Sequence, residues 1–168
     1  MKQTFTLLIG LAAAIAFSCP LSAAVPDTPG SKLITVQGGA GPGFGGLISG
    51  NIAMANLGAA HLYGGLQLGA NFRHGAVGAR KTELSLAPRL MLGWNLGKVV
   101  EFHVGAFAGI DAVRFDADKS QLAFCYSGFG GFRFNISNSF ALVAEGYYAY
   151  PQKFQAVPYG SAGFAFRF

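Results

Sequence analysis

The last ten residues constrain the fold more than any other part of the chain. From Tyr159 to Phe168 the side chains alternate strictly: Phe164, Phe166 and Phe168 share one parity, and Arg167 has the other. A period of two is typical of a β-strand, so one face of this strand is a row of aromatic rings. In water such a row would stay exposed at the chain end. A closed barrel in lipid gives the row an apolar surrounding and gives each strand edge a partner, so the pattern favours a membrane-spanning β-barrel.

The composition agrees with a single all-β membrane domain. The 168 residues are enough for one domain. Hydrophobic residues make up 52% of the chain and charged residues only 11%, where soluble domains carry about a quarter charged residues. After residue 24 no uninterrupted apolar run approaches the roughly 20 residues of a membrane-spanning helix. The 25 glycines and 16 phenylalanines favour many short strands instead.

Residues 1–24 have the features of a secretory signal peptide, which we expect to be removed. Lys2 supplies the positive end, residues 5–17 the apolar centre, and residues 22–24 are small, as signal cleavage requires. A membrane anchor is disfavoured because the apolar run is short and ends at Pro20. A lipoprotein cleaved before Cys19 is a further alternative. Without Lys2, the 12 basic residues become 11 against seven acids, so the net charge falls from +5 to +4.

Residues 25–31 are predicted to form a short periplasmic linker, and residues 32–168 a barrel of eight alternating segments. The segments are residues 32–40, 44–55, 61–73, 82–95, 99–111, 121–135, 139–149 and the closing strand. Most of them reach the roughly 9–11 residues that a tilted strand needs to cross a bilayer. Short connections at 56–60, 96–98 and 136–138 alternate with longer ones at 74–81, 112–120 and 150–157, while the short link 41–43 breaks this pattern. The sequence predicts an eight-stranded antiparallel up-and-down transmembrane β-barrel.

The choice between a membrane barrel and a soluble barrel depends on which face points outward. A soluble barrel would bury the apolar face and expose the other one. That other face consists mainly of glycine, alanine, serine and aromatic residues, which suit a narrow interior better than a water-exposed surface. On the apolar face the aromatic residues gather toward the strand ends, as two membrane-interface belts would. These residues are Phe72, Trp94, Phe102, Phe124, Tyr126, Phe134, Phe140, Tyr148 and Phe168.

One segment carries a resemblance to a known family. Residues 130–150, GGFRFNISNSFALVAEGYYAY, resemble the penultimate hairpin of the opacity-protein and OmpA-like family of small outer-membrane barrels. The closing strand is similar to that of bacterial outer-membrane barrels in general. The resemblance implies a monomeric barrel in the outer membrane of a Gram-negative bacterium. It also implies that Phe164, Phe166 and Phe168 form the signal for the barrel-assembly machinery.

The inward-facing charged groups need partners, because eight strands leave an interior only wide enough for side chains and an unpaired buried ion is costly. Ordered by strand position, they form three layers, each containing both signs of charge. They are Arg73, Glu83 and Asp111 toward the loops, Arg89, His103 and Glu145 in the middle, and Glu101, Arg133 and Arg167 toward the short turns. We expect an ion-pair network that plugs the barrel. A narrow pore for polar solutes, lined by the same groups, is the alternative.

Catalysis is not required by the sequence. Some barrels of the resembled kind are lipid A deacylases that use a serine, a histidine and an acid. This chain has His61, His74 and His103 but no His-x-Ser-Asn cluster, and the parity of His103 points it inward. No metal site or other cofactor is predicted, because no two histidines have a ligand spacing and Cys125 remains alone once the leader is removed. Nucleic-acid binding is disfavoured because no basic run or stacking motif is present.

The predicted loops are the remaining place for an activity. Arg73, Arg80 and Lys81 cluster around one long connection. Solvated loop charge is the simplest interpretation. The sharper hypothesis is contact with the phosphates of outer-leaflet lipopolysaccharide through charge-assisted hydrogen bonds. The predicted role is structural or surface interaction, such as envelope integrity, adhesion or antigen display, with outer-membrane lipid around the barrel and an extracellular partner at the loops.

Overall fold

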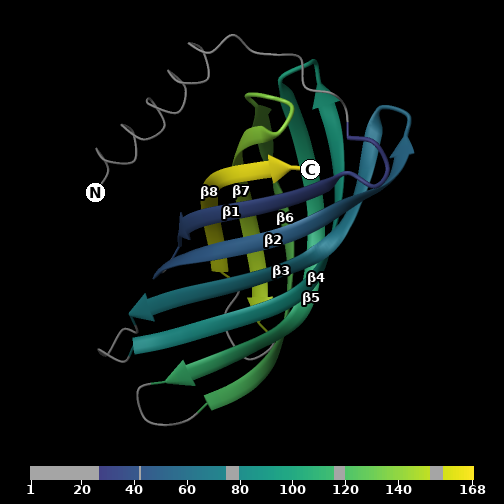
Figure 1. The fold of residues 1–168 in the computed structure, drawn as a ribbon. Coiled ribbons are helices and arrows are strands. Elements are labelled where there is room, and N and C mark those ends of the chain that lie inside the picture. Colours follow the sequence, from purple (N-terminus) through teal and green to yellow (C-terminus); the bar gives the residue numbers. More distant parts are fainter. Residues whose placement is uncertain (1–26, 42, 75–79, 116–119, 152–156) are drawn as a thin grey trace, which may run out of the picture.

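The computed structural model describes residues 27–41, 43–74, 80–115, 120–151 and 157–168. The expected leader, residues 1–24, lies outside this range. Eight strands form a closed barrel in which each strand pairs with the next in sequence and the last pairs with the first (Figure 1). They are β1 (Lys32–Ala40), β2 (Gly43–Leu57), β3 (Ala60–His74), β4 (Arg80–Leu96), β5 (Val100–Phe115), β6 (Ser120–Asn135), β7 (Phe140–Pro151) and β8 (Val157–Arg167). The predicted antiparallel eight-stranded architecture is confirmed.

Several strands extend further than the alternation of the sequence predicted. Strand β4 has 17 residues, whereas the alternation predicted only residues 82–95. The hydrogen-bond ladder continues past the apolar residues, and His74 of β3 is still paired with Arg80 of β4. A ladder between two strands uses backbone groups alone, so polar side chains at the strand ends do not stop it. The connections 75–79, 116–119 and 152–156 are therefore shorter than predicted.

The two ends of the barrel differ in their connections. At one end, here called the turn end, residues 58–59, 97–99 and 136–139 join consecutive strands, and Phe168 ends the chain nearby (upper part of Figure 1). Gly58 and Gly97 have φ of 75° and 84°, a backbone conformation that glycine adopts without steric cost. The opposite end, here called the loop end, carries the connections 75–79, 116–119 and 152–156.

The barrel closes between β1 and β8. Their register places Val36 opposite Phe164. One residue beyond β8, the Lys32 amide donates to the Phe168 carbonyl at 3.0 Å, and the Phe168 amide donates to the Lys32 carbonyl at 2.9 Å. A Cβ at Gly163 would collide with the backbone of Val36 and Gln37, so the two closing strands require glycine at this position. The terminal aromatic strand is thus held along its whole length.

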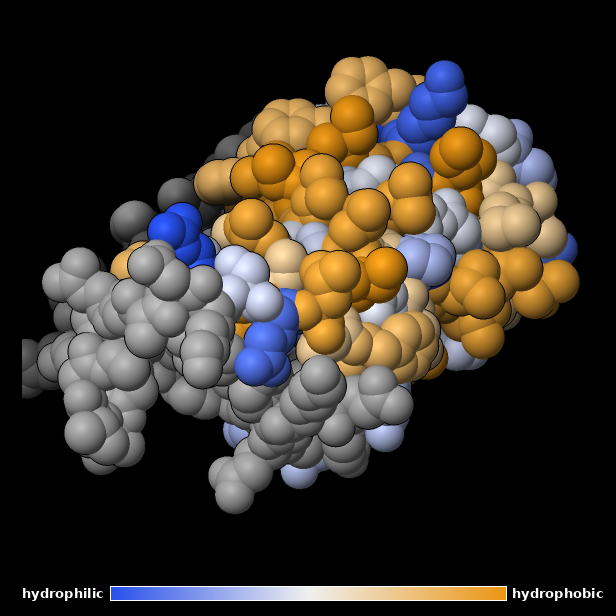
Figure 2. Space-filling view, turned by 90° about the horizontal axis from the view of Figure 1, so that it is seen from below, coloured by the Kyte–Doolittle hydropathy of each residue, from blue (hydrophilic) through white to orange (hydrophobic). Residues whose placement is uncertain are grey.

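The outer surface of the barrel is apolar. Leucine and isoleucine side chains on β2, β3 and β4, among them Ile48, Leu66, Leu68, Leu84 and Leu90, are each more than half exposed. Figure 2 shows such residues joined into a broad hydrophobic surface. A fully exposed side chain of this kind costs about 1.5–3 kcal/mol in water relative to an apolar medium, and many half-exposed ones lie side by side here, so the surface requires a lipid surrounding. Among the described residues, no helix is long and apolar enough to cross a membrane.

The inner surface carries the other parity of each strand. Along β6, for example, Ala123, Cys125, Ser127 and Phe129 are buried while the residues between them are exposed. A cluster of apolar side chains fills part of the interior. It contains Leu47, Ala53, Tyr63, Met91, Phe129 and Tyr147. The remaining interior volume holds the charged and polar groups described next.

Candidate functional site

The carboxylate of Glu145 on β7 is the centre of the first interior cluster, here called the central cluster. It accepts hydrogen bonds from Arg89 Nη2 on β4 at 3.1 Å, His103 Nε2 on β5 at 2.9 Å and Gln37 Nε2 on β1 at 2.8 Å. The Tyr147 hydroxyl donates to the same carboxylate. Four strands are thereby tied together through one side chain. The sequence had placed Arg89, His103 and Glu145 in a single layer, and the structure brings these three into contact.

Two neighbouring features make the buried charge tolerable. The side chains of Arg89 and Glu145 are 1% and 3% exposed, and the Arg89 guanidinium lies over the Phe129 ring at 4.1 Å from its centroid. A cation above an aromatic face is attracted by the ring quadrupole. Gly131 is paired with Glu145 across β6 and β7, and a Cβ there would lie 2.9 Å from the Glu145 Cγ. The glycine therefore lets the Glu145 side chain and the β7 backbone lie directly against β6.

A second cluster, here called the turn-end cluster, surrounds Arg133 on β6. Its guanidinium pairs with Glu101 on β5 and with Asp27 Oδ2 at 2.7 Å. The Tyr63 hydroxyl accepts a hydrogen bond from Arg133 at 2.9 Å and donates one to Asp27 at 2.5 Å. Arg167 on β8 pairs with the other oxygen of Asp27. The predicted layer of Glu101, Arg133 and Arg167 is joined here, with Asp27 linking the two arginines.

The acid Asp27 lies in the segment that the sequence suggested was only a linker. Burial by itself would raise the pKa of this carboxyl group. Arg133, the Tyr63 hydroxyl and Arg167 act in the opposite direction and hold the pKa below its ordinary value. Asp27 is therefore ionised at neutral pH, and its charge balances the guanidinium groups around it.

His61 lies outside these two clusters but is also buried near the turn end. Its Nδ1 is 2.7 Å from the Asn56 Oδ1 and its Nε2 is 2.9 Å from the Asn95 Nδ2. An amide oxygen accepts and an amide nitrogen donates, so Nδ1 donates to Asn56 and Nε2 accepts from Asn95. His61 thus acts as a bridge between β3 and two neighbouring strands.

The predicted layer nearest the loops is only partly described. Glu83 is buried on β4 and Asp111 is half-buried on β5, near Cys125, which is buried on β6. Register pairs join Ser85 to Asp111 and Gly109 to Cys125, so these groups share one region of the interior. The side chain of Arg73, the cation predicted for this layer, lies outside the described residues, as do the side chains of Arg80 and Lys81.

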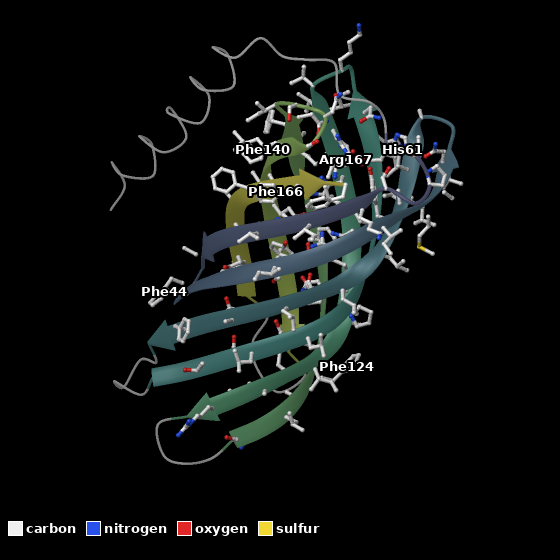
Figure 3. The ribbon with its side chains drawn as sticks, in the orientation of Figure 1. Phe44, His61, Phe124, Phe140, Phe166 and Arg167 are labelled. Carbon is white, nitrogen blue, oxygen red and sulfur yellow. The ribbon has the colours of Figure 1, made fainter. Side chains whose placement is uncertain are left out.

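Outward-facing aromatic residues gather at both ends of the apolar surface. At the turn end Trp94 stacks on Phe102 with a centroid distance of 6.1 Å, and Phe140 packs on Phe164 and Phe166 at 5.6 and 5.5 Å. Figure 3 shows Phe140 and Phe166 projecting outside the ribbon near Arg167. The remaining predicted belt residues also face outward. They are Phe72, Phe124, Tyr126 and Tyr148 toward the loop end, and Phe134 and Phe168 at the turn end.

Several members of the two clusters were not predicted from the sequence. Gln37, Tyr63 and Tyr147 have the inward parity, which could have marked them as interior groups, but uncharged residues gave no reason to assign them partners. Asp27 gave no such signal because it precedes the first strand. In the part of the chain that the structure describes, no group of three or more His, Cys, Asp or Glu could hold a metal ion.

No family model and no curated protein sequence matches this chain. Solved structures share its fold. Neisserial surface protein A (NspA) is 14% identical, with a TM-score of 0.61 and coverage of 82% of this chain and 95% of that protein. Ail of Yersinia pestis, the attachment invasion locus protein, is 14% identical, with a TM-score of 0.60 and coverage of 84% and 100%. The outer membrane enzyme PagL is 17% identical, with a TM-score of 0.50 and coverage of 79% and 97%.

These structures confirm the resemblance to small outer-membrane barrels at the level of the fold. Independently of these structures, the outward surface is apolar and the inward surface holds the ions, as a barrel embedded in a membrane requires. The chain is therefore a transmembrane β-barrel of the outer-membrane type. Its fold is shared with surface proteins and with an enzyme, so the fold by itself does not decide the activity.

Proposed function

We propose that this protein is a monomeric outer-membrane barrel with a structural or surface-interaction role, and that its own ion pairs plug its interior. The observation that carries the plug is the central cluster, in which Glu145 engages side chains from β1, β4 and β5. The turn end would face the periplasm and the loop end the outside, as short turns and longer loops do in such barrels. Envelope integrity, adhesion and antigen display are roles of this kind.

The plug is expected to make the barrel electrically silent. Breaking a buried ion pair such as Arg89–Glu145 costs about 3–5 kcal/mol, and at 3 kcal/mol only about one molecule in 150 would be open at a given moment. We therefore expect no steady conductance when the purified protein is inserted into planar lipid bilayers. As a matched control, K98Q removes an exposed charge at the turn end and should remain equally silent.

A narrow pore is the alternative that this experiment distinguishes. Steady single-channel conductance of the wild-type protein that changes in R89Q or E145Q, but not in K98Q, would replace the plug with a pore. Silence in the wild type together with intermittent openings in E145Q would support the plug, because that substitution removes the charge that holds Arg89.

Surface interaction is proposed for the loop end, where three adjacent strands carry basic residues. The backbone register pairs Arg73 with Lys81 and His74 with Arg80. On the next strand Arg114 is paired with Thr82 and its side chain is exposed. Ail, a protein of the same fold, has been solved in complex with the heparin analogue sucrose octasulfate, a polyanion. We propose that the basic residues contact phosphates of outer-leaflet lipopolysaccharide, by charge-assisted hydrogen bonds.

The test is to neutralise the three predicted contacts together in R73Q/R80Q/K81Q. The amount of lipopolysaccharide that co-purifies with the folded barrel should fall, and its heat stability in lipopolysaccharide-containing micelles should fall with it. The control K32Q/K98Q removes exposed charge from the turn end, where outer-leaflet phosphates are absent, and should change neither quantity. Unchanged co-purification and unchanged heat stability in the triple variant would refute the contact.

We propose no catalytic activity. The His103 Nε2 is bound to Glu145 and the residue is 2% exposed. His103 therefore does not reach a lipid substrate or a water molecule outside the barrel, and a general base must lie within hydrogen-bond reach of the proton that it removes. PagL gives the concrete counter-hypothesis, an enzyme on this fold. Mass spectrometry of lipid A from cells that overproduce the protein should show no new species. A modified lipid A that disappears in H103N, H61N or H74N would make the protein an enzyme.

The aromatic face of β8 is proposed as the contact with the barrel-assembly machinery. Phe164, Phe166 and Phe168 are 50%, 40% and 73% exposed and share one face of the closing strand. A single strand that ends in such a row is accessible before the barrel closes, so a partner can bind it during insertion.

A further inference from the structure

Asp27 is held in a site that engages both oxygens of its carboxylate. Oδ2 is bound by Arg133 and by the Tyr63 hydroxyl, and Oδ1 pairs with Arg167. The side chain of Asp27 is 2% exposed although the residue precedes the first strand. Two guanidinium groups and a hydroxyl surround one carboxylate, with hydrogen bonds from Arg133 and Tyr63 to Oδ2 and an ion pair from Arg167 to Oδ1. This is the geometry of a carboxylate-binding site, because charge-assisted contacts to an anion are strong.

The backbone around Asp27 directs this side chain into the turn end. Residues 27–31, here called the N-terminal strap, bend back on themselves, with the Ser31 amide donating to the Thr28 carbonyl at 2.9 Å and Gly30 at φ 94°. The strap is tied to β2 where the β1–β2 ladder ends. Gly30 donates to the Ala53 carbonyl at 2.8 Å, and the Ala53 amide donates to the Ser31 carbonyl at 2.9 Å. The strap therefore lies across the turn end in a fixed conformation.

The cationic groups are held by contacts other than Asp27. Arg133 pairs with Glu101 and lies 5.4 Å from the centroid of the Tyr63 ring. Arg167 donates from Nη1 to the Asn138 carbonyl at 3.0 Å and from Nη2 to the Asn135 Oδ1 at 3.3 Å. These contacts fix the two guanidinium groups in the strands and in the β6–β7 turn. A site whose donors are positioned by the barrel itself loses little entropy when an anion enters it.

The charges of the cluster also favour an anion. The two arginines carry two positive charges, and Glu101 supplies one negative charge. Asp27 supplies the second and makes the cluster neutral. Without Asp27 one cationic charge would be left with only partial compensation in a desolvated region, which is costly. The charge count therefore favours a singly negative group at this position.

We propose that Arg133, Arg167 and Tyr63 form a carboxylate-binding site at the turn end. Asp27 of the same chain occupies this site and thereby closes that mouth of the barrel. A small free carboxylate binds there when the Asp27 side chain is absent. The site is distinct from the central cluster, because Arg89 and His103 bind Glu145 instead. Its ligand class is a carboxylate, and the strap is the built-in ligand.

The experiment is chemical rescue of D27G in protein purified from outer membranes into detergent. D27G removes the side chain that occupies the site and keeps the length of the strap. We expect a lower unfolding temperature than the wild type at pH 7, and a saturable recovery on adding sodium formate or sodium acetate. Sodium chloride at the same ionic strength should give no recovery, which separates site binding from general screening.

Three further proteins make the result specific. D27N fills the site with a neutral group of the same shape, so it should be destabilised but not rescued. The wild type, whose site is occupied, should not respond to acetate. D27G/R167Q lacks one of the two guanidinium groups, so its response to acetate should be lost or much weaker than that of D27G. A saturable rescue confined to D27G supports the proposal.

Three results would overturn it: D27G as stable as the wild type, equal effects of acetate and chloride, or equal rescue of D27G and D27G/R167Q. If D27G does not remain folded after extraction, the readout becomes the refolding yield in acetate against chloride, with the same expectations. The conductance and lipopolysaccharide experiments change other residues, so their outcomes do not decide whether the carboxylate-binding site exists.

Discussion

Replacing Glu145 with Gln tests the arrangement on which the interior depends. The side chain keeps its shape but loses its charge. Arg89 then remains buried without an anionic partner, and the new amide group presents hydrogen atoms toward donors such as His103. Removing one partner of a buried ion pair costs about 3–5 kcal/mol. The equilibrium constant for folding should fall by a factor of about 150 to 5000.

The assay can use the fluorescence of Trp94, the single tryptophan of the chain. Trp94 faces outward and stacks on Phe102 at the turn end, so its emission reports on insertion into lipid. Urea unfolding of the barrel in lipid vesicles, followed through this signal, gives the free energy of unfolding of the wild type and of E145Q. The slope against urea concentration should be unchanged, since the same surface is exposed on unfolding.

The control is the double variant R89M/E145Q, which removes both charges and keeps a long side chain beside Phe129. With both charges removed, no unpaired ion is left in the interior, and an uncompensated buried ion is what makes the single replacement costly. We therefore expect the double variant to be more stable than E145Q, with a coupling energy of at least about 2 kcal/mol. A cost below about 1 kcal/mol for E145Q, or a double variant that loses the sum of the two single losses, would refute a charge-paired interior.

Three further predictions concern the turn end and the closing strand. The pKa of Asp27 is held below its ordinary value of 3.8, so its stabilising effect is complete above that pH and is lost as the pH falls through the lower folded-state value. The difference in free energy of unfolding between wild type and D27N should therefore be constant from pH 8 to about 4 and shrink below pH 4. A difference that is still undiminished at pH 2 would contradict this. G163A should lower the free energy of unfolding by about 1–3 kcal/mol because its Cβ meets the Val36 backbone. The control G160A lies on the same strand, where a Cβ meets open space, and should change the free energy of unfolding by no more than about 0.5 kcal/mol. Equal effects of the two substitutions in urea titrations would argue against the close β1–β8 contact. F168A should reduce the amount of heat-modifiable barrel in outer membranes. F44A, which alters another well-exposed aromatic residue at the loop end, should not. Similar losses in both variants would remove the special role of the C-terminal row.

Much of the fold could be predicted because the alternation of side chains within each strand assigns its two faces locally. The alternation of Leu84, Leu86 and Leu90 with Glu83 and Arg89 assigns the two faces of β4 without reference to any other strand. The strand ends were less predictable. The ladder at His74 and Arg80 extends β3 and β4 beyond the apolar pattern, because backbone hydrogen bonds are indifferent to side-chain polarity.

The candidate site was predictable only as a set of inward charges. Position along each strand placed Arg89, His103 and Glu145 at one level, and this level is the one at which they meet. Which groups actually touch depends on the stagger of eight strands around a closed barrel, and that stagger is fixed by pairing between distant residues such as Val36 and Phe164. The contacts of Gln37 and Tyr147 with Glu145 follow from the same closure.

The sequence by itself determined that the chain forms alternating strands with an apolar face toward lipid and sparse ions on the other, because side-chain parity and turn residues act over only a few positions. The tertiary structure alone decided that Asp27, outside every strand, lies between Arg133 and Arg167. Those two arginines are more than thirty positions apart in the sequence, on β6 and β8, and they come together only when the barrel closes. Which charged groups pair depends on the distance between them in the folded barrel, and no local sequence pattern encodes that distance.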